Sequence, residues 1–391
     1  MGRDIEKRHS PDSPEKIARQ AELFMNRLSK QYKYLRKWAR KNRVSSYRLY
    51  DRDIPEIPLA CDLYSFLPDD VNDKLSAILF FNEQNAAISR NDKNAAQVLS
   101  DELSRTYLHV YLYERPYEKS DEDEKIWLDA MTSAACSVLG IGKSHVITKT
   151  RKKQSGTESG RNGQYEKIES VEKICGLVFE QGQIFHVNLS EYIDTGLFFD
   201  HRPLRDMVRA SCDKKSVLNL FCYTGSFSVY AAEGRARRVE SVDLSNTYID
   251  WAKKNMLLND FSDEKKYVFT RQDAVGFLNQ KNEEPVNEDG SNRYDIIILD
   301  PPTFSNSKKT DSTLDINRDW SVLVSKCLGI LTGRGILYFS TNSRRLSFSD
   351  DLLPKASDGT PLYNAAEITE KTIPEDYRNA KIHRVWKITK A

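Results

Sequence analysis

Acidic side chains follow three apolar segments in the second half of the chain. Asp243 follows RVESV, Asp273 follows KYVFTRQ, and Asp300 follows YDIIIL. Segments of this length, rich in β-branched and aromatic residues, are typical of buried strands. A carboxylate at the end of a strand can accept hydrogen bonds from ribose hydroxyls or from the amino group of a base. The spacing therefore predicts a nucleoside site, with Asp243 facing a ribose and Asp273 facing an adenine amine.

A tight turn after the preceding apolar segment completes this candidate site. The stretch 219–228, NLFCYTGSFS, contains one glycine, Gly225, and no GxGxxG pattern. A pyrophosphate needs close approach at two glycines, so the turn disfavours a dinucleotide-dependent oxidoreductase. One glycine is enough for a nucleoside that carries an amino-acid tail. Taken singly, Gly225 could be only a turn glycine and Asp243 only a helix cap; the ordered set favours a cofactor site.

The last of the three acidic residues opens the motif Asp300-Pro301-Pro302-Thr303-Phe304. Two consecutive prolines fix an extended backbone, and their missing N–H groups leave the carbonyls free to face a planar base. Phe304 can stack on that base. We predict that the catalytic residues are Asp300, Pro301, Pro302 and Phe304. The alternative is a rigid turn that only ends a strand.

The elements around these motifs predict how they are positioned. From Lys215 onward, apolar strands alternate with helices, which indicates a parallel sheet covered on both faces, with a terminal antiparallel strand pair. Ligands of such sheets bind at the carboxyl ends of the strands. Residues 46–189 mix strands and helices. We expect a basic helical arm at 1–45, a small RNA-binding α+β domain at 46–190, and the catalytic α/β domain at 191–391.

Charge is balanced overall but unevenly distributed. The 391 residues include 59 Lys+Arg and 57 Asp+Glu, yet residues 1–48 carry a net charge of +9 and the remainder −7. A helix is predicted from Pro14 to Lys41, capped by Ser13, with an apolar stripe at Ile17, Phe24, Leu28, Leu35 and Trp38. Its lysines could contact phosphates, or the helix could be purely structural. The residues that we expect to contact RNA are Lys30, Lys33, Lys37, Lys152, Lys153, Lys308, Arg344 and Arg345.

Composition excludes several protein classes. No apolar run approaches the roughly 18 residues of a membrane-spanning helix, and the N-terminus lacks the apolar core of a secretory signal. None of the six cysteines forms a CxxC pair, so we expect no metal site and no disulfide framework. A cytoplasmic location is the expectation.

Five segments resemble the class I S-adenosylmethionine-dependent RNA methyltransferases, and most closely the RlmK family, the C-terminal half of the bifunctional bacterial 23S rRNA methyltransferases. They are GLFFDHRPLR at 196–205, NLFCYTGSFSVYAA at 219–232, SVDLSNTYIDWAKKN at 241–255, DPPTFSNSKK at 300–309 and FSTNSRRLSF at 339–348. The resemblance implies a Rossmann-like domain with a mostly parallel seven-stranded sheet. It also implies S-adenosylmethionine as the cofactor.

The same resemblance implies a role for each matched position. The expected cofactor contacts are Phe198, Asp200, Arg202, Asn219, Phe221, Tyr223, Thr224, Gly225, Asp243, Leu244, Ser245, Asp273 and Ala274. Among them, Arg202 suits the carboxylate of the cofactor. The expected reaction is methylation of guanine N7 in domain V of 23S rRNA, either free or in a large-subunit assembly particle. The module that methylates a second guanine at N2 is absent here, so a separate protein could supply it.

Guanine N7 carries a lone pair at neutral pH, so methyl transfer needs alignment rather than a general base. A cytosine-C5 enzyme on the same scaffold would need a nucleophilic cysteine. The stretch 340–343, where related enzymes carry it, reads STNS. Methylation of a guanine or adenine exocyclic amine stays open, because the acidic-Pro-Pro-aromatic motif suits it too. A non-catalytic RNA-binding or ribosome-assembly factor is the alternative from a different class.

Overall fold

The computed structural model describes residues 12–90, 93–115, 117, 119–151, 172–305 and 313–391. The chain divides into two compact units, Met1–Gly182 with Val187–Thr195, and Gln183–His186 with Gly196–Ala391. The predicted boundaries at 45/46 and 190/191 stay predictions. Each unit is described by itself below.

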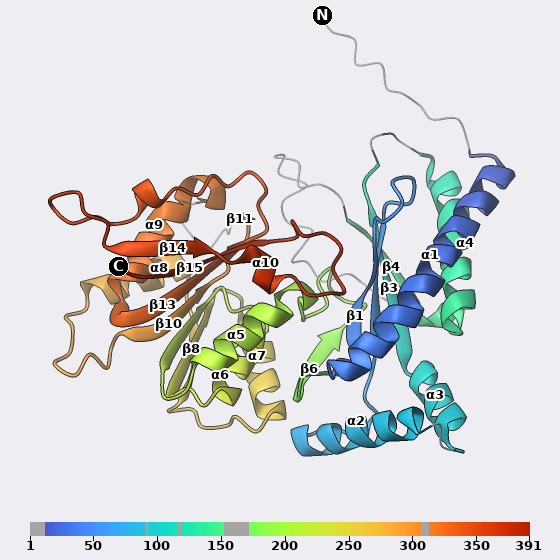
Figure 1. Cartoon of the computed structure of the whole chain (residues 1–391), viewed down its shortest axis with the longest axis horizontal. Coiled ribbons are helices and arrows are strands. Elements are labelled where there is room, and N and C mark those ends of the chain that lie inside the picture. The colour runs from blue at the N-terminus through green and yellow to red at the C-terminus, as the bar shows by residue number, and fades with distance from the viewer. Residues whose placement is uncertain (1–11, 91–92, 116, 118, 152–171, 306–312) are drawn as a thin grey trace, which may run out of the picture. The chain divides into compact units, whose positions relative to one another are not determined.

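A four-stranded sheet forms the centre of the first unit (Figure 1). Its strands are β1 (Ser46–Asp51), β2 (Leu59–Ser65), β3 (Thr106–Tyr113) and β4 (Val146–Arg151), in that order. The first three are antiparallel and β4 runs parallel to β3. The unit also contains α2 (Lys74–Ser89), α3 (Ala95–Ser104), η1 (Lys143–His145) and β5 (Cys175–Glu180), whereas the residues of β6 (Gln183–Asn188) are divided between the two units. Helices α2 and α3 were not predicted from the sequence.

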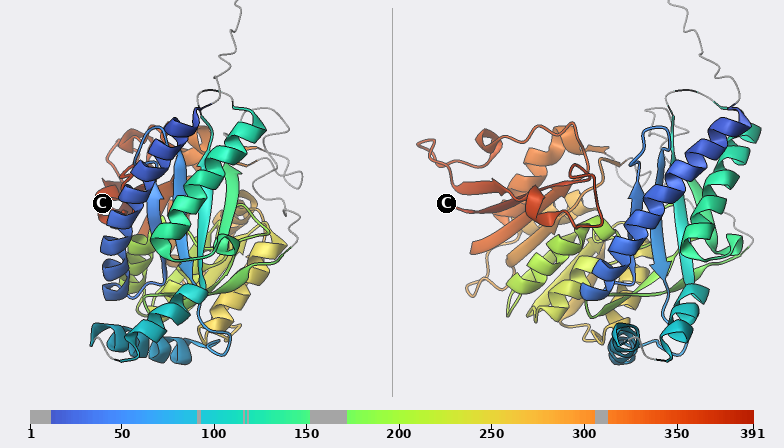
Figure 2. Two further views of the ribbon diagram at one scale, coloured as in Figure 1. Left: turned by 90° about the vertical axis from the view of Figure 1, so that its right-hand side faces the viewer. Right: turned by 45° about the vertical axis from the view of Figure 1, so that its right-hand side comes forward.

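Two long helices cover one face of this sheet. Helices α1 (Pro14–Lys41) and α4 (Asp121–Leu139) lie side by side across it (Figure 2). The predicted bounds and Ser13 cap of α1 are confirmed, because the Ser13 side chain accepts from the Lys16 amide. From the predicted stripe, Phe24, Leu28 and Leu35 are buried in a core shared with α4 and the strands, and Ile17 and Trp38 pack at its margin. The helix is therefore anchored through its apolar face.

The second unit contains the predicted seven-stranded, mostly parallel sheet, which confirms the α/β fold class. The strand order is β14-β15-β13-β10-β7-β8-β9. The strands are β7 (Ser216–Leu220), β8 (Arg238–Asp243), β9 (Tyr267–Arg271), β10 (Tyr294–Leu299), β13 (Leu331–Thr341), β14 (Tyr363–Glu367) and β15 (Arg384–Lys390). Strand β15 is antiparallel to both its neighbours, β13 and β14, and the other pairs are parallel.

Helices cover both faces of this sheet (Figure 1). Helices α8 (Ala274–Glu283) and α9 (Ile316–Gly329) pack on one face in a core with β10 and β13. The other face carries α5 (Arg202–Ser211), α6 (Ser226–Glu233) and α7 (Asn246–Leu258). Short elements complete the unit: η3 (Phe199–His201), β11 (Phe304–Ser305), β12 (Leu314–Asp315), η4 (Asp350–Leu352) and α10 (Thr369–Thr372).

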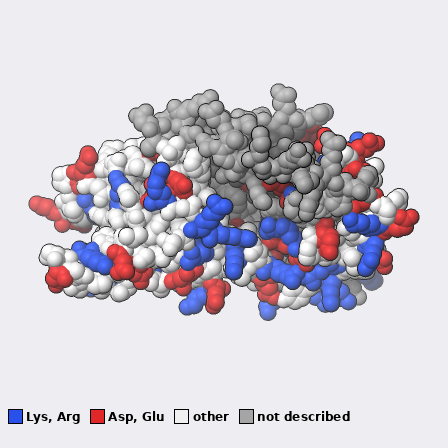
Figure 3. Space-filling model, turned by 90° about the horizontal axis from the view of Figure 1, so that it is seen from above, with Lys and Arg blue, Asp and Glu red and all other residues white. Residues whose placement is uncertain are grey.

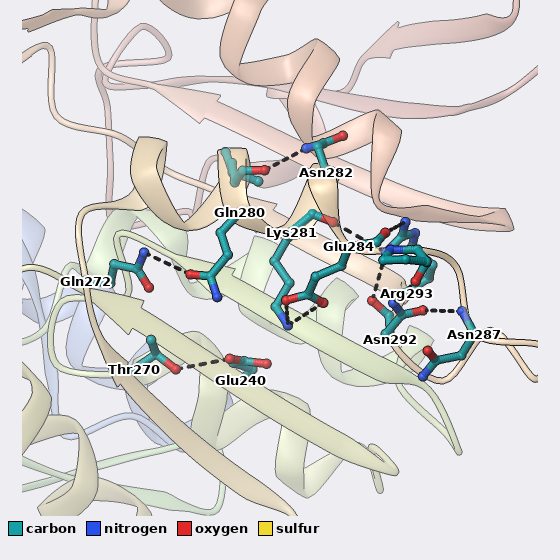
Figure 4. A network of polar contacts seen from close by, with 12 residues as sticks. Glu240, Thr270, Gln272, Gln280, Lys281, Asn282, Glu284, Asn287, Asn292 and Arg293 are labelled. Carbon is teal, nitrogen blue, oxygen red and sulfur yellow. Dashed lines mark hydrogen bonds and ion pairs between the residues drawn. The ribbon is translucent and has the colours of Figure 1, made fainter.

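A polar network ties the loop after α8 back onto its own ends (Figure 4). The Arg293 guanidinium donates to the Glu284 carbonyl at 2.9 Å, and the Asn292 amide donates to the Pro285 carbonyl at 2.7 Å. Lys281 pairs with Glu284 at 3.0 Å. The first two bonds give partners to backbone carbonyls that directly follow the end of α8. The segment 284–293 is thus a loop that closes on itself and leads into β10.

We expect burial, and not helix propensity, to hold α1 in place. Leu28→Ala, at a fully buried position, should lower the free energy of unfolding by about 2–5 kcal/mol. Leu23→Ala is the matched control on the same helix, because Leu23 is 46% exposed, and it should change stability by about 0.5 kcal/mol or less. Urea unfolding of both variants measures the difference. Equal losses would contradict the packing described for α1.

Candidate active site

The strand order reverses next to β7. The candidate site is therefore the edge of the sheet formed by the carboxyl ends of the strands beside this reversal. From β7 the chain passes outward to β8 and β9, then returns to add β10 on the opposite side of β7. Ligands of open parallel sheets bind where such a reversal separates two neighbouring connections. The carboxyl ends of β7, β8, β9 and β10 carry the predicted residues. Tertiary structure therefore brings together the motifs that the sequence spreads over 80 residues and more.

The turn that follows β7 has an unusual backbone. Phe221, Tyr223 and Gly225 have φ values of 55°, 50° and 75°. Non-glycine residues adopt this left-handed region infrequently, and it costs free energy that surrounding contacts must offset. The Cys222 amide donates to the Val242 carbonyl at 3.0 Å, and the Thr224 hydroxyl donates to the Gly196 carbonyl at 2.5 Å. Contacts within the chain thus hold the turn in this shape.

Two features require glycine at position 225: the positive φ angle and the lack of room for a side chain. A Cβ at this position would lie 2.8 Å from the Cβ of Ala252 on α7. Real Cβ atoms do not approach so closely, so glycine lets α6 begin against α7. The turn therefore presents bare backbone at the strand end, which fits the close passage of a nucleoside.

Asp243 at the end of β8 organises the same turn. Its Oδ2 accepts from the Tyr223 amide at 3.0 Å, and its Oδ1 accepts from the Ser245 amide at 2.9 Å. A carboxylate has about four lone-pair positions, so each oxygen keeps capacity for a ribose hydroxyl. Burial raises the pKa of Asp243, and the amide bonds from Ser245, Tyr223 and Leu244 oppose that rise. The arrangement fits the predicted role at the ribose, which stays a prediction.

Aromatic rings gather around the turn. Phe198 is 41% exposed, and its ring centroid lies 5.2 Å from that of Tyr223. Tyr223 in turn meets the edge of Tyr248 on α7 at 4.6 Å. Such rings can bound the flat purine of a nucleoside. Sequence reasoning selected Phe198 and Tyr223 but missed Tyr248, because it lies within a helix and only folding brings it to the turn.

Several other predicted cofactor contacts also have local structural tasks. Asp273 caps α8 by accepting from the Gly276 amide at 2.9 Å, and Ser245 caps α7. The Asn219 amide donates to the Ser228 hydroxyl at 2.9 Å. Phe221, Leu244 and Ala274 are buried or half-buried beside these caps. Their roles toward a cofactor stay predictions.

The segment at 198–202 is tied to the C-terminal part of the unit. The Arg202 guanidinium, almost fully buried, donates to Asp376 at 3.0 Å. Asp200 lies 2.9 Å from the imidazole of His383. The structure thus gives Arg202 a carboxylate partner within the chain. The predicted contact of Arg202 with the carboxylate of the cofactor stays a prediction.

The Asp300 motif follows β10, beside the turn. Asp300 accepts a hydrogen bond from the Ser340 hydroxyl at the end of β13, and its side chain is 27% exposed. Pro301 is buried and Pro302 is half-buried. Thr303 donates to the Asn342 side chain, and Phe304 lies in β11, paired with β12. Stretches 300–304 and 340–342, far apart in sequence, are therefore neighbours.

The structure describes five of the eight residues that are predicted to contact RNA. Lys30, Lys33 and Lys37 are exposed on α1, and Arg344 and Arg345 are exposed after β13. None of these five side chains forms an ion pair with another described residue, whereas Arg27 and Arg40 of α1 pair with Asp53 and Glu102. Lys152, Lys153 and Lys308 lie outside the described residues.

The model of the S-adenosylmethionine-dependent methyltransferase family matches residues 88–372 of this sequence. The chain belongs to this family. It is 37% identical to ribosomal RNA large subunit methyltransferase K of Neisseria meningitidis over 365 residues, covering 93% of this chain and 86% of that protein. It is also 36% identical to ribosomal RNA large subunit methyltransferase K/L of Pseudomonas fluorescens over 375 residues, 96% of this chain. The resemblance to RlmK is confirmed.

The K/L relatives are much longer than this S-adenosylmethionine-dependent methyltransferase. The chain spans 41% of the Pseudomonas fluorescens protein and 44% of that of Pseudomonas paraeruginosa. The fold has solved counterparts: SMU.776, described as a methyltransferase complexed with SAH, has a TM-score of 0.61 at 18% identity over 95% of this chain and 82% of that one. A protein of Streptococcus mutans described as a SAM-dependent methyltransferase matches with a TM-score of 0.61 at 17% identity, covering 95% of this chain and 81% of that one.

The cofactor of this methyltransferase is S-adenosylmethionine. The turn geometry at Gly225, the remaining acceptor capacity of Asp243 and the exposed ring of Phe198 fit a nucleoside with an amino-acid tail. Among the described residues, no helix is long and apolar enough to cross a membrane.

If Asp243 accepts from the ribose, Asp243→Ala should weaken S-adenosylmethionine binding about ten- to a hundredfold, the equivalent of roughly 1.5–3 kcal/mol for charge-assisted hydrogen bonds. Isothermal titration calorimetry measures the affinity. Asp250→Ala, an exposed position on α7, is the matched control and should bind normally. Unchanged affinity in a folded Asp243→Ala variant would refute the assignment.

Proposed function

We propose that this protein transfers a methyl group from S-adenosylmethionine to N7 of a guanine in domain V of 23S rRNA. The observation that carries the proposal is the Asp300-Pro301-Pro302-Thr303-Phe304 motif, which follows β10 at the reversal of strand order, next to the cofactor turn. The names of the relatives, which include ribosomal RNA large subunit methyltransferase K, support rRNA as the substrate. The substrate form is free rRNA or a large-subunit assembly particle.

In the proposed reaction the protein aligns the base and stabilises charge. The cofactor supplies an electrophilic methyl group on a sulfonium. Guanine N7 attacks through a lone pair, so no proton is removed first, and in-line positioning contributes most of the rate. Phe304 would stack on the guanine ring and the Asp300 carboxylate would hold its edge. That carboxylate also stabilises the positive charge that methylation places on the base.

Two features bear on the alternative targets. A cytosine-C5 reaction needs an accessible thiolate, but Cys222 at the cofactor turn is buried, and burial raises its pKa well above the ordinary thiol value. The stretch 340–343 contains no cysteine. Methylation of an exocyclic amine would differ from the proposal by requiring the loss of a proton.

The experiment that tests the proposal is nucleoside mass spectrometry of unmodified 23S rRNA after incubation with the protein and S-adenosylmethionine. The expected product is 7-methylguanosine, mapped to domain V by fragment analysis. An N2-methylguanosine, N6-methyladenosine or 5-methylcytidine product would overturn the guanine-N7 assignment. Absence of any methylated nucleoside, with the cofactor bound, would favour a non-catalytic RNA-binding factor.

We expect Asp300→Ala and Phe304→Ala to lower single-turnover methyl transfer by about a hundredfold or more, because each removes a contact to the reacting base. Their affinity for S-adenosylmethionine should fall much less, since the proposed contacts of both residues are with the base and not with the cofactor. Rapid-quench kinetics and calorimetry separate the two effects. Wild-type turnover in either variant would defeat the role proposed for that residue.

The exposed lysines of α1 are the proposed RNA surface of the first unit. Lys30, Lys33 and Lys37 are solvent-exposed, and the apolar face of the helix is already buried. On the face drawn in Figure 3, Lys and Arg are interspersed with Asp and Glu, so charge of one sign does not cover it. The three lysines form a local positive cluster on α1, within residues 1–48, which have a net charge of +9. Such a cluster suits the attraction of RNA phosphates.

Changing Lys30, Lys33 and Lys37 together to Glu should weaken rRNA binding and flatten its salt dependence. Each lost phosphate contact should reduce the log–log salt slope by about 0.7–0.9. The matched control changes three exposed lysines of the second unit, Lys214, Lys265 and Lys390, to Glu, for the same change in net charge. Salt-titrated binding measures both slopes. If the two triple variants have the same slope as the wild type, α1 has no electrostatic role.

A further inference from the structure

Two histidine rings stack beside Asp300, and the reaction proposed above does not use them. His201 ends η3, and His383 directly precedes β15. Both side chains are buried, their ring centroids lie 4.6 Å apart, and their planes differ by 8°. The Phe227 ring packs on His201 at 5.7 Å. The pair is therefore a rigid, stacked element next to the candidate catalytic carboxylate.

Hydrogen-bond partners on both sides hold the ring of His383. Its Nε2 lies 2.9 Å from the Thr372 hydroxyl, which also lies 2.8 Å from the Thr369 carbonyl. Its Nδ1 lies 2.9 Å from Oδ2 of Asp200. Because both ring nitrogens have a partner, the orientation of the His383 ring is fixed.

The surroundings of His201 favour its neutral form. Burial is the main cause that lowers the pKa of His201, and His383 and Arg205 act in the same direction. Asp300 and Asp200 oppose them. A neutral imidazole has one N–H and one lone pair, so one nitrogen of His201 can donate to a carboxylate.

The orientation of the His201 ring determines which group it can serve. Its Nδ1 lies 3.9 Å from Oδ2 of Asp300 and 3.9 Å from Oδ2 of Asp200. Its Nε2 is buried and has no hydrogen-bond partner among the described residues. The 3.9 Å separations exceed hydrogen-bond length, but bonds of this kind often tighten only when substrate is bound.

Each carboxylate oxygen of Asp300 has a polar group of the protein beside it. Its Oδ1 accepts from the Ser340 hydroxyl, and its Oδ2 faces the Nδ1 of His201. We propose that His201 is a positioning residue of the methyl-transfer site, whose imidazole, held by stacking on His383, orients the Asp300 carboxylate toward the base. This inference rests on the proposed function, in which Asp300 faces the target base.

A metal ion fits the same side chains less well. Asp200, His201 and His383 bring potential ligand atoms within 4.8 Å of one another. Two parallel stacked rings cannot both aim an in-plane lone pair at one ion about 2.0–2.1 Å away. Both nitrogens of His383 also have partners already. A role in orienting Asp300 therefore explains more of the contacts of His201 and His383 than a metal site does.

Two substitutions at His201 separate positioning from packing. His201→Phe keeps a ring on His383 and removes both nitrogens, whereas His201→Asn keeps an amide N–H near the place of Nδ1. Single-turnover methylation of unmodified 23S rRNA should fall about ten- to a hundredfold in the Phe variant, as for loss of a hydrogen bond to a charged group. The Asn variant should recover most of the rate. Cofactor affinity and the KM for RNA should stay within about twofold.

If His201 had only a structural role, its substitution would leave the pH dependence of the rate unchanged. The pH profile therefore tests the positioning role. His201 faces the titratable groups Asp200, Asp300 and His383 and the guanidinium of Arg205. Because the pKa of His201 is lowered, the neutral ring persists into mildly acidic solution and is lost as the pH falls further. A protonated His201 would offset the Asp300 carboxylate that stabilises the positive charge on the base, so the wild-type rate should fall in an acid limb below the ordinary histidine range, and the Asn variant should lack that limb. His145→Phe is the matched control, since His145 also stacks, on Tyr107 at 4.6 Å and 7°.

The outcomes distinguish this inference from the proposed function. Wild-type rates and pH profiles in both His201 variants, with Asp300→Asn inactive, would overturn the positioning role and leave the function standing. Equal losses in the Phe and Asn variants with an unchanged acid limb would also overturn it. Full activity in Asp300→Asn would instead remove the catalytic role of Asp300. If the Phe variant does not fold, the rate and pH profile of the Asn variant decide the question.

Discussion

The parallel pairing of β7 with β8 on one side and β10 on the other is the constraint on which the site depends. Leu218 of β7 lies opposite Glu240 on one side and Ile297 on the other, so the three carboxyl ends lie at one edge. The connections leave β7 and β10 in opposite directions, and ligands of open parallel sheets bind at such a reversal. Asp243 and Asp300 owe their proximity to the cofactor turn to this pairing and not to sequence distance.

Contacts within the chain shape the cofactor turn. Left-handed backbone at Phe221 and Tyr223 costs free energy, and the Asp243 carboxylate offsets part of it by accepting from the Tyr223 amide. Gly225 removes the steric conflict that any Cβ would have with Ala252. A site prepared in this way loses little conformational freedom on binding, which improves affinity. The same contacts make the turn intolerant of substitution.

Buried ionic contacts connect this edge of the sheet to the C-terminal part of the unit. Arg202 pairs with Asp376, and Asp200 pairs with His383, although each pair is separated by more than 170 residues in sequence. Arg205 adds a hydrogen bond to the Phe198 carbonyl at 2.7 Å. Charges buried without partners are costly, so each of these groups fixes the place of the other. The stacked histidines, and through them Asp300, therefore depend on the antiparallel end of the sheet.

The sequence by itself determined the elements whose signals are local. The α1 cap at Ser13 and its apolar stripe follow from residues three, four and seven apart, and the alternation of apolar strands with helices predicted the parallel sheet. Helices α2 and α3 escaped prediction: the apolar residues of α2 have no clear helical period, and Leu75 and Leu79 remain exposed. Only the tertiary structure decided which distant side chains meet. Tyr248 joins the turn, Ser340 bonds Asp300, and His201 stacks on His383 because neighbouring strands set their distances, and no local pattern records that adjacency.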